Sequence, residues 1–127
     1  MVEQTEGGDK VQLKHVEVQS AKGWYAGPWD RSFLLPVGYA HAGIDDPHLH
    51  RRMTEVYLIA RGTADVRVDQ ETIRVEAGDM LVVEPGEAHT FLANSPEYFH
   101  FVLQIPGLSP EEVRAERLTV PRARLGL

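Results

Sequence analysis

Short hydrophobic runs in this chain alternate with polar residues at a period of two, the pattern of half-buried β-strands. Val66 to Val68 and Ile73 to Val75 show it, with a polar turn between them. Turn-forming residues separate the runs, among them Gly78-Asp79, Pro85-Gly86 and Gly62, for which a positive φ is expected. The pattern predicts strands at residues 11–19, 33–39, 48–50, 55–61, 66–68, 73–75, 80–83, from 89 onward, and 98–105.

The two ends of the chain are predicted to be less regular. Residues 1–9 are expected to be frayed, and residues 23–29, rich in aromatic residues and glycine, to form a loop. Ser109 fits the N-cap of a short helix over residues 109–117, because proline and acidic residues follow it in the first turn. Residues 118–127 are expected to be a tail or a strand that adds to a partner.

Four potential metal ligands stand at spacings that strands can bring together. His48 and His50 are two residues apart and so share one face of a strand. Glu55 would face the other way in an unbroken strand, but a polar turn at residues 51–54 restores its facing. His89 opens a later strand, and a closed sheet is needed to bring it back. A lone histidine is usually an ordinary residue, but three imidazoles and a carboxylate are a first-row transition-metal ligand set.

The two segments that hold these residues resemble the two signature motifs of the cupin superfamily. The first motif reads G, five residues, H-x-H, three or four residues, E, six residues, G. In this chain only four residues separate Gly43 from the first histidine. The second reads G, five residues, P-x-G, two residues, H, three residues, N; here Pro85 directly precedes Gly86, and Asn94 comes one residue late. All four ligand positions are filled, and the resemblance covers residues 32–105.

Similarity to cupins implies an all-β fold, an antiparallel jelly-roll (double-stranded β-helix) barrel with the metal inside it. One divalent transition metal per chain is expected, with its identity open among Fe, Mn, Ni, Co, Cu and Zn. The implied metal ligands are His48, His50, Glu55 and His89. Cupins include dioxygenases, isomerases, decarboxylases, lyases and proteins that only bind or store, so the resemblance does not select one reaction.

Several further residues are candidates for the wall of the cavity around the metal. Glu55 could act as a base as well as a ligand, and Tyr57, next on the same face, could be a catalytic residue or a plain core tyrosine. In the strand at 98–105, the face that begins with Phe99 is the better candidate for the core, and the opposite face for the cavity or for solvent. The candidate substrate-binding residues are Tyr39, Phe91, His100 and Gln104.

Composition and charge argue against several classes of function. A net charge of −6 and a pI of about 5.4 argue against nucleic acid as a partner, because such binding relies on a basic face. The chain has no cysteine, which excludes thiolate metal sites and fits a reducing cytoplasm. No apolar run approaches the ~18 residues of a membrane span, and the acidic N-terminus does not resemble a signal peptide. A cytoplasmic protein with a single domain over residues 1–127 is expected.

Two function classes stay open from the sequence. The first is a metal-dependent enzyme of dioxygenase, isomerase or lyase type that acts on a small molecule. The second is a non-catalytic binder or sensor, in which the metal only holds the ligand. Arg51 and Arg52 could steer an anionic substrate or be surface charges on a turn. A homodimer is expected as well, because a short barrel has strand edges to protect.

Overall fold

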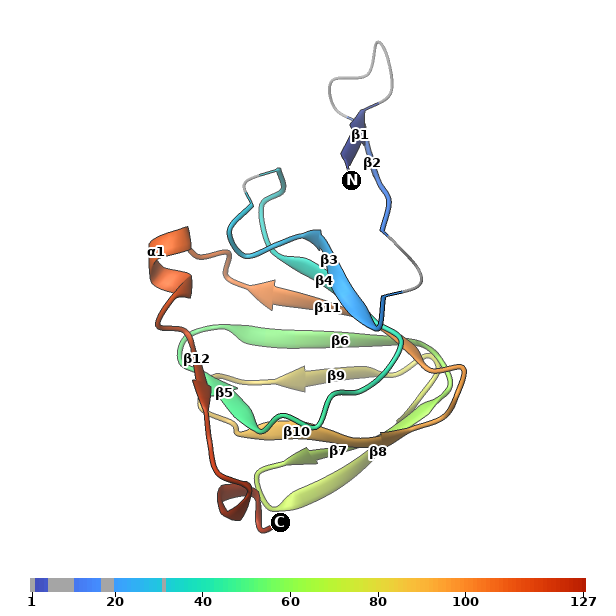
Figure 1. The fold of residues 1–127 in the computed structure, drawn as a ribbon, viewed down its shortest axis with the longest axis vertical. Helices are drawn as coiled ribbons and strands as arrows, with labels where there is room; N and C mark the ends of the chain where they lie inside the picture. Colours follow the sequence, from blue (N-terminus) through green and yellow to red (C-terminus); the bar gives the residue numbers. More distant parts are fainter. Residues whose placement is uncertain (1, 5–10, 17–19, 31) are drawn as a thin grey trace.

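The computed structural model describes residues 2–4, 11–16, 20–30 and 32–127. Two five-stranded sheets form a barrel (Figure 1). In strand order, the first sheet contains β12 (Arg117–Thr119), β5 (His48–His50), β10 (His89–Asn94), β7 (Thr63–Val68) and β8 (Glu71–Glu76). The second contains β3 (Lys22–Ala26), β4 (Val37–Ala40), β11 (Phe99–Ile105), β6 (Thr54–Arg61) and β9 (Met80–Val83). All these pairings are antiparallel, which confirms the predicted jelly-roll barrel.

The interior of the barrel is built from the inward faces of both sheets. The buried cluster contains Tyr57, Ile59, Ala64, Val66, Val75, Val83, Phe91 and Tyr98. Each fully buried valine of this kind stabilises the fold by about 1.5–3 kcal/mol. One face of β11 is as expected, since His100 and Gln104 are buried and line the cavity. The other is not, because Phe99 is half-buried on the outer face and does not form the core. On that outer face, Tyr39 of the neighbouring strand β4 lies directly opposite Phe101.

The aromatic segment predicted to be a loop contains a strand, β3, which pairs with β4. Glycine explains the pairing: a side chain at Gly38 would meet the ring of Trp24, and one at Gly23 would meet the ring of Tyr39. Aromatic rings therefore lie over glycines on the neighbouring strand, a cross-strand arrangement that stabilises a sheet edge. The next strand is shorter than predicted, since β4 begins only after Pro36, which has no N–H to donate.

The N-terminal predictions are partly corrected. The segment predicted to be frayed contains β1 (Val2–Gln4), which pairs with β2 (Gln12–Lys14) as a separate two-stranded sheet. The strand predicted at residues 11–19 is therefore short, and its residues 17–19 lie outside the described residues.

The C-terminal segment begins as predicted and then departs from the prediction. Ser109 caps α1 (Pro110–Val113) with a full capping box, in which its hydroxyl accepts from the backbone N–H of Glu112. The helix ends at Val113 rather than near residue 117. The chain then adds β12 to the edge of β5 within the same molecule, with Arg117 opposite His50. A short 3₁₀ helix, η1 (Arg122–Leu125), follows, and none of the helices in the described ranges is long and apolar enough to cross a membrane.

Candidate metal centre

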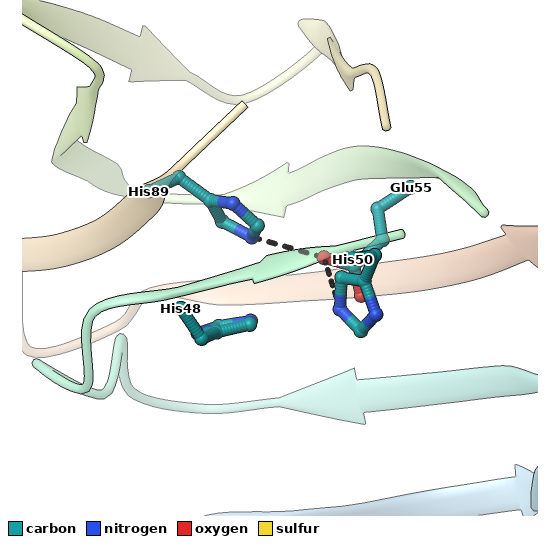
Figure 2. Close-up of side chains that lie close together, drawn as sticks. All are labelled: His48, His50, Glu55 and His89. Atoms are coloured by element: carbon teal, nitrogen blue, oxygen red, sulfur yellow. Dashed lines mark hydrogen bonds and ion pairs between the residues drawn. The ribbon is translucent and has the colours of Figure 1, made fainter. Parts of the chain in front are cut away.

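Four side chains from three strands converge inside the barrel (Figure 2). His48 and His50 project from β5, and His89 projects from β10, directly opposite His48 in the strand register. Glu55 projects from β6 in the other sheet, after the turn that follows β5. One potential ligand atom from each residue lies within 4.8 Å of all the others. The predicted facing is thus observed: three imidazoles from one sheet meet a carboxylate from the other.

Glu55 lies at the middle of the cluster and is only 5% exposed. Its Oε1 accepts a hydrogen bond from the Tyr57 hydroxyl (2.9 Å) and lies 3.3 Å from Nε2 of His50. Its Oε2 accepts from the side-chain amide of Gln104 (3.1 Å). Burial would raise the pKa of Glu55, but the imidazoles of His50 and His89 outweigh that effect and hold the pKa well below its ordinary value. The group is therefore a carboxylate at neutral pH.

Backbone carbonyls orient two of the three imidazoles. Nδ1 of His48 donates to the carbonyl of Asp46 (2.6 Å), and Nδ1 of His89 donates to the carbonyl of Glu87 (3.0 Å). These hydrogen bonds fix the tautomer and leave both Nε2 atoms facing the cluster, as in histidines that ligate metals. Burial, together with the nearby His89, lowers the pKa of His48 to about 4, so this imidazole is neutral at pH 7.

The distance between His89 and Glu55 tests whether a metal fits. Nε2 of His89 lies 3.0 Å from Oε1 of Glu55. When the ring of His89 holds one proton, on Nδ1 toward the carbonyl of Glu87, Nε2 presents a lone pair to the carboxylate oxygen. A cation shared by the two atoms satisfies both of them. The donor set of nitrogen and oxygen, with no sulfur, also fits the divalent metals expected from the sequence.

The cluster opens on a cavity of about 330 Å³. All the residues proposed from the sequence as catalytic or substrate-binding contribute to its wall, namely Tyr39, Glu55, Tyr57, Phe91, His100 and Gln104. The ring of Tyr39, however, packs against Tyr25 and Phe99 on the outer face of the sheet. Tyr57 and Phe91 form an edge-to-face pair with ring centroids 5.4 Å apart, so together they make a rigid apolar wall beside His89.

Two polar groups on β11 are positioned to meet a ligand. The Tyr98 hydroxyl and Nδ1 of His100 are hydrogen-bonded (2.6 Å), and in the tautomer in which the hydroxyl donates, the second ring nitrogen of His100 carries an N–H. Burial lowers the pKa of His100 to about 4, so the ring is neutral. Gln104 gives its N–H to Glu55, while its Oε1 is buried with no hydrogen-bond partner among the described residues. One donor and one acceptor are therefore left for a bound molecule.

Two cations also lie at the cavity, and the sequence did not single them out for this role. Lys22 comes from β3 and Arg117 from β12. The Arg117 charge is close enough to the centre to oppose protonation of His48. Arg117 also pairs with Asp46, since its Nη2 donates to Oδ2 at 2.5 Å. Of the arginines considered from the sequence, Arg52 forms a 2.8 Å ion pair with Glu112 on the surface. Arg117 could not be singled out, because its position depends on β12 folding back onto β5.

Glu116 is a further buried acidic residue beside the site, and the sequence analysis did not single it out. It is only 2% exposed and lies 4.0 Å from Nδ1 of His50. A glutamate among several arginines carries no sequence signal for burial.

Comparison with known proteins supports the fold of the barrel. Residues 34–105 match the family model described as the cupin domain. A cupin protein from Bacteroides fragilis is 24% identical, with 72% of this chain and 80% of that chain covered at a TM-score of 0.57. KdgF from Halomonas sp. is 21% identical, with 67% and 76% covered at a TM-score of 0.55.

A third similar structure is Pac13, described as a nucleoside dehydratase and solved from Streptomyces with uridine bound. It is 13% identical, with 85% of this chain and 92% of that chain covered at a TM-score of 0.56. No curated protein matches the chain. Identities this low show a shared fold alone. The match over residues 34–105 spans more than half of the chain, and together with the two motifs and the barrel it shows that this protein belongs to the cupin family.

Proposed function

We propose that this protein is a metal-dependent enzyme that acts on a small, hydroxylated anion by proton transfer, the chemistry of isomerases and lyases. The observation that carries the proposal is the arrangement of the cavity wall. Three of the four ligand residues, His48, His50 and Glu55, line one cavity together with the neutral imidazole of His100 and two cations. The same wall holds the buried amide oxygen of Gln104, which has no hydrogen-bond partner among the described residues. A cluster that only stored metal would need none of these groups.

When bound by His48, His50, Glu55 and His89, one divalent metal per chain would act as a Lewis acid and template for a substrate oxygen. The remaining roles belong to the protein. Lys22 and Arg117 bind the anionic group of the substrate at the cavity mouth. The free N–H of His100 donates to a substrate oxygen on which negative charge develops, and Oε1 of Gln104 accepts from a substrate hydroxyl.

Glu55 is proposed as the group that accepts a proton from substrate carbon. Its Oε1 accepts from Tyr57 and lies against the imidazoles, whereas the one partner of Oε2 among the described residues is the Gln104 amide. Burial and the charge of Glu55 raise the pKa of Tyr57 well above its ordinary value, so Tyr57 stays protonated and keeps its hydrogen bond. Tyr57 thus orients the base rather than acting as a base itself.

Deuterium exchange tests this function directly. Protein loaded separately with Mn, Fe, Co, Ni, Cu or Zn would be incubated in D₂O with sugar acids and α-hydroxy acids, and NMR would follow loss of the C–H signal next to the carboxylate or carbonyl. We expect exchange or turnover with at least one metal form, abolished in Glu55→Gln and slowed in His100→Asn. His15→Gln, which changes an exposed histidine outside the cavity, is the matched control.

Two other outcomes would replace the proposal. Oxygen uptake that tracks product formation would assign the dioxygenase chemistry also considered from the sequence. Tight binding of one compound at the metal, with no exchange and no product, would assign a non-catalytic binder or sensor. A small molecule is the proposed partner in all three cases, and a cytoplasmic homodimer that binds neither nucleic acid nor membrane remains a prediction.

A further inference from the structure

Glu116 lies in the segment between α1 and β12, next to the end of β5, and its side chain is buried. Its Oε2 accepts from the backbone N–H groups of Arg52 and Met53, both at 2.8 Å. Its main-chain carbonyl accepts from the N–H of Arg51 (2.9 Å). The residue therefore ties down the turn between His50 and Glu55, which sets how these two potential ligands face each other.

The hydrogen bonds in the turn do not explain why this residue is glutamate rather than glutamine. Two backbone N–H groups need only a neutral carbonyl oxygen, which glutamine would supply. A carboxylate removed from water costs several kcal/mol unless an opposite charge or further hydrogen bonds compensate it. The second oxygen of Glu116, Oε1, has no hydrogen-bond partner among the described residues.

His50 carries the complementary unpaired group. Nδ1 of His48 and Nδ1 of His89 both meet backbone carbonyls, but Nδ1 of His50 is buried with no hydrogen-bond partner in the described part of the chain. It lies 4.0 Å from Oε2 of Glu116. Buried polar atoms are nearly always paired, so an unpaired Nδ1 this close to a carboxylate that keeps one oxygen unpaired points to a hydrogen bond formed in another state of the site.

We propose that Glu116 is a positioning residue for metal binding: it accepts the Nδ1–H of His50 when Nε2 of His50 ligates the metal. A small rotation of the imidazole closes the 4.0 Å gap. The hydrogen bond would hold the tautomer with Nε2 unprotonated, and the negative charge would make the ring a stronger ligand. A metal bound to His50 would make the imidazole N–H more positive, and its attraction to Glu116 would offset the desolvation free energy of the buried carboxylate. This inference rests on the proposed metal binding.

Metal titration of Glu116→Gln tests the proposal. The amide oxygen can still accept from Arg52 and Met53, so the metal-free variant should fold. Calorimetric titration with Ni²⁺ or Co²⁺ should show an affinity about 10–100-fold below that of the wild type, the usual effect of removing an outer partner of a ligating histidine. Glu111→Gln removes the same charge from an exposed position of the same segment and should bind metal as the wild type does.

The outcomes separate this inference from the proposed function. A wild type that binds metal together with an equally tight Glu116→Gln variant would overturn the role of Glu116 and leave the metal site intact. A wild type that binds no metal would overturn both. If the variant does not fold, imidazole NMR of the Zn²⁺-loaded wild type decides: a slowly exchanging Nδ1–H on His50 is expected, and a rapidly exchanging one would overturn the inference.

Discussion

Gln104 lies directly across the strand pair from Glu55 and donates a hydrogen bond to its Oε2 at 3.1 Å. The two residues are on β11 and β6, the central pair of their sheet, so this contact fixes the carboxylate to the most strongly paired part of the barrel. It also keeps the side chain of Gln104 turned toward the cluster. Glu55 therefore has three roles: it is hydrogen-bonded within the sheet, it belongs to the potential metal ligands, and it is the proposed base.

Glu55→Gln should therefore keep the barrel and lose function. The amide is nearly the same size but neutral, so it is a poor ligand and a poor base. We expect metal affinity to fall by more than the ~10–100-fold typical of an outer-shell change, and any turnover to fall by orders of magnitude. Circular dichroism and metal titration would check this. Wild-type affinity in the variant would remove Glu55 from the ligand set.

The ligand set could be predicted from the sequence because each step depends on local geometry. Strand periodicity places His48 and His50 on one face, and the turn after β5 brings Glu55 back toward them. Glu116 and Arg117 could not be predicted, since they reach the site only through the pairing of β12 with β5. A strand of three residues has too little periodicity to reveal which edge it joins.

Arg117→Gln should weaken the binding of anionic ligands selectively. A hydrogen bond to a charged group contributes about 1.5–3 kcal/mol, so affinity for a carboxylate-bearing ligand should fall by roughly ten- to a hundredfold. The neutral amide or alcohol analogue should bind the variant and the wild type alike. Arg52→Gln is the matched control, because Arg52 pairs with Glu112 away from the cavity. An equal loss for charged and neutral ligands would contradict the role of Arg117.

The metal-free protein should lose stability in mild acid. His100 has a pKa of about 4 in the fold and near 6.5 when unfolded, so between these values the unfolded chain binds more protons. Stability therefore rises with pH across this window and falls as the pH drops from 7 to 5, by about 2 kcal/mol from this residue. Urea unfolding at both pH values would show a smaller fall in His100→Asn. An identical fall in variant and wild type would refute the buried, neutral His100.

A homodimer is expected to form through the outer face of the sheet that contains β6 and β9. Leu58 and Met80 face each other there in register, and both are exposed, Met80 by 64%. A row of exposed apolar side chains on a sheet is a common site of association. Met80→Lys should shift sedimentation from dimer toward monomer, whereas Leu92→Lys, at an exposed leucine of the other sheet, should not. A wild type that sediments as a monomer at tens of micromolar would rule the dimer out.

Gly62→Ala should destabilise the barrel more than Gly86→Ala. Gly62 has the positive φ predicted from the sequence, 76°, and a side chain there would lie 2.8 Å from the Cα of Tyr98. Gly86 has a similar φ of 84° but open space around it. Alanine at Gly86 should cost only the backbone strain, about 1–2 kcal/mol, and alanine at Gly62 distinctly more. If urea unfolding showed the same loss in free energy of unfolding for both variants, the backbone at Tyr98 would be able to shift without strain.

Because β12 pairs with the edge of β5, the C-terminal segment limits where the chain can be truncated or joined to part of a related barrel. The family match stops at residue 105, yet Arg117 lies at the cavity and Glu116 supports the turn between two ligand residues. A version trimmed to the matched region would keep the histidines and lose their support. It would also expose the edge of β5, the strand that carries His48 and His50, to pairing with other chains. In a chimera of two such barrels, the C-terminal segment should therefore come from the same parent as the first histidine motif.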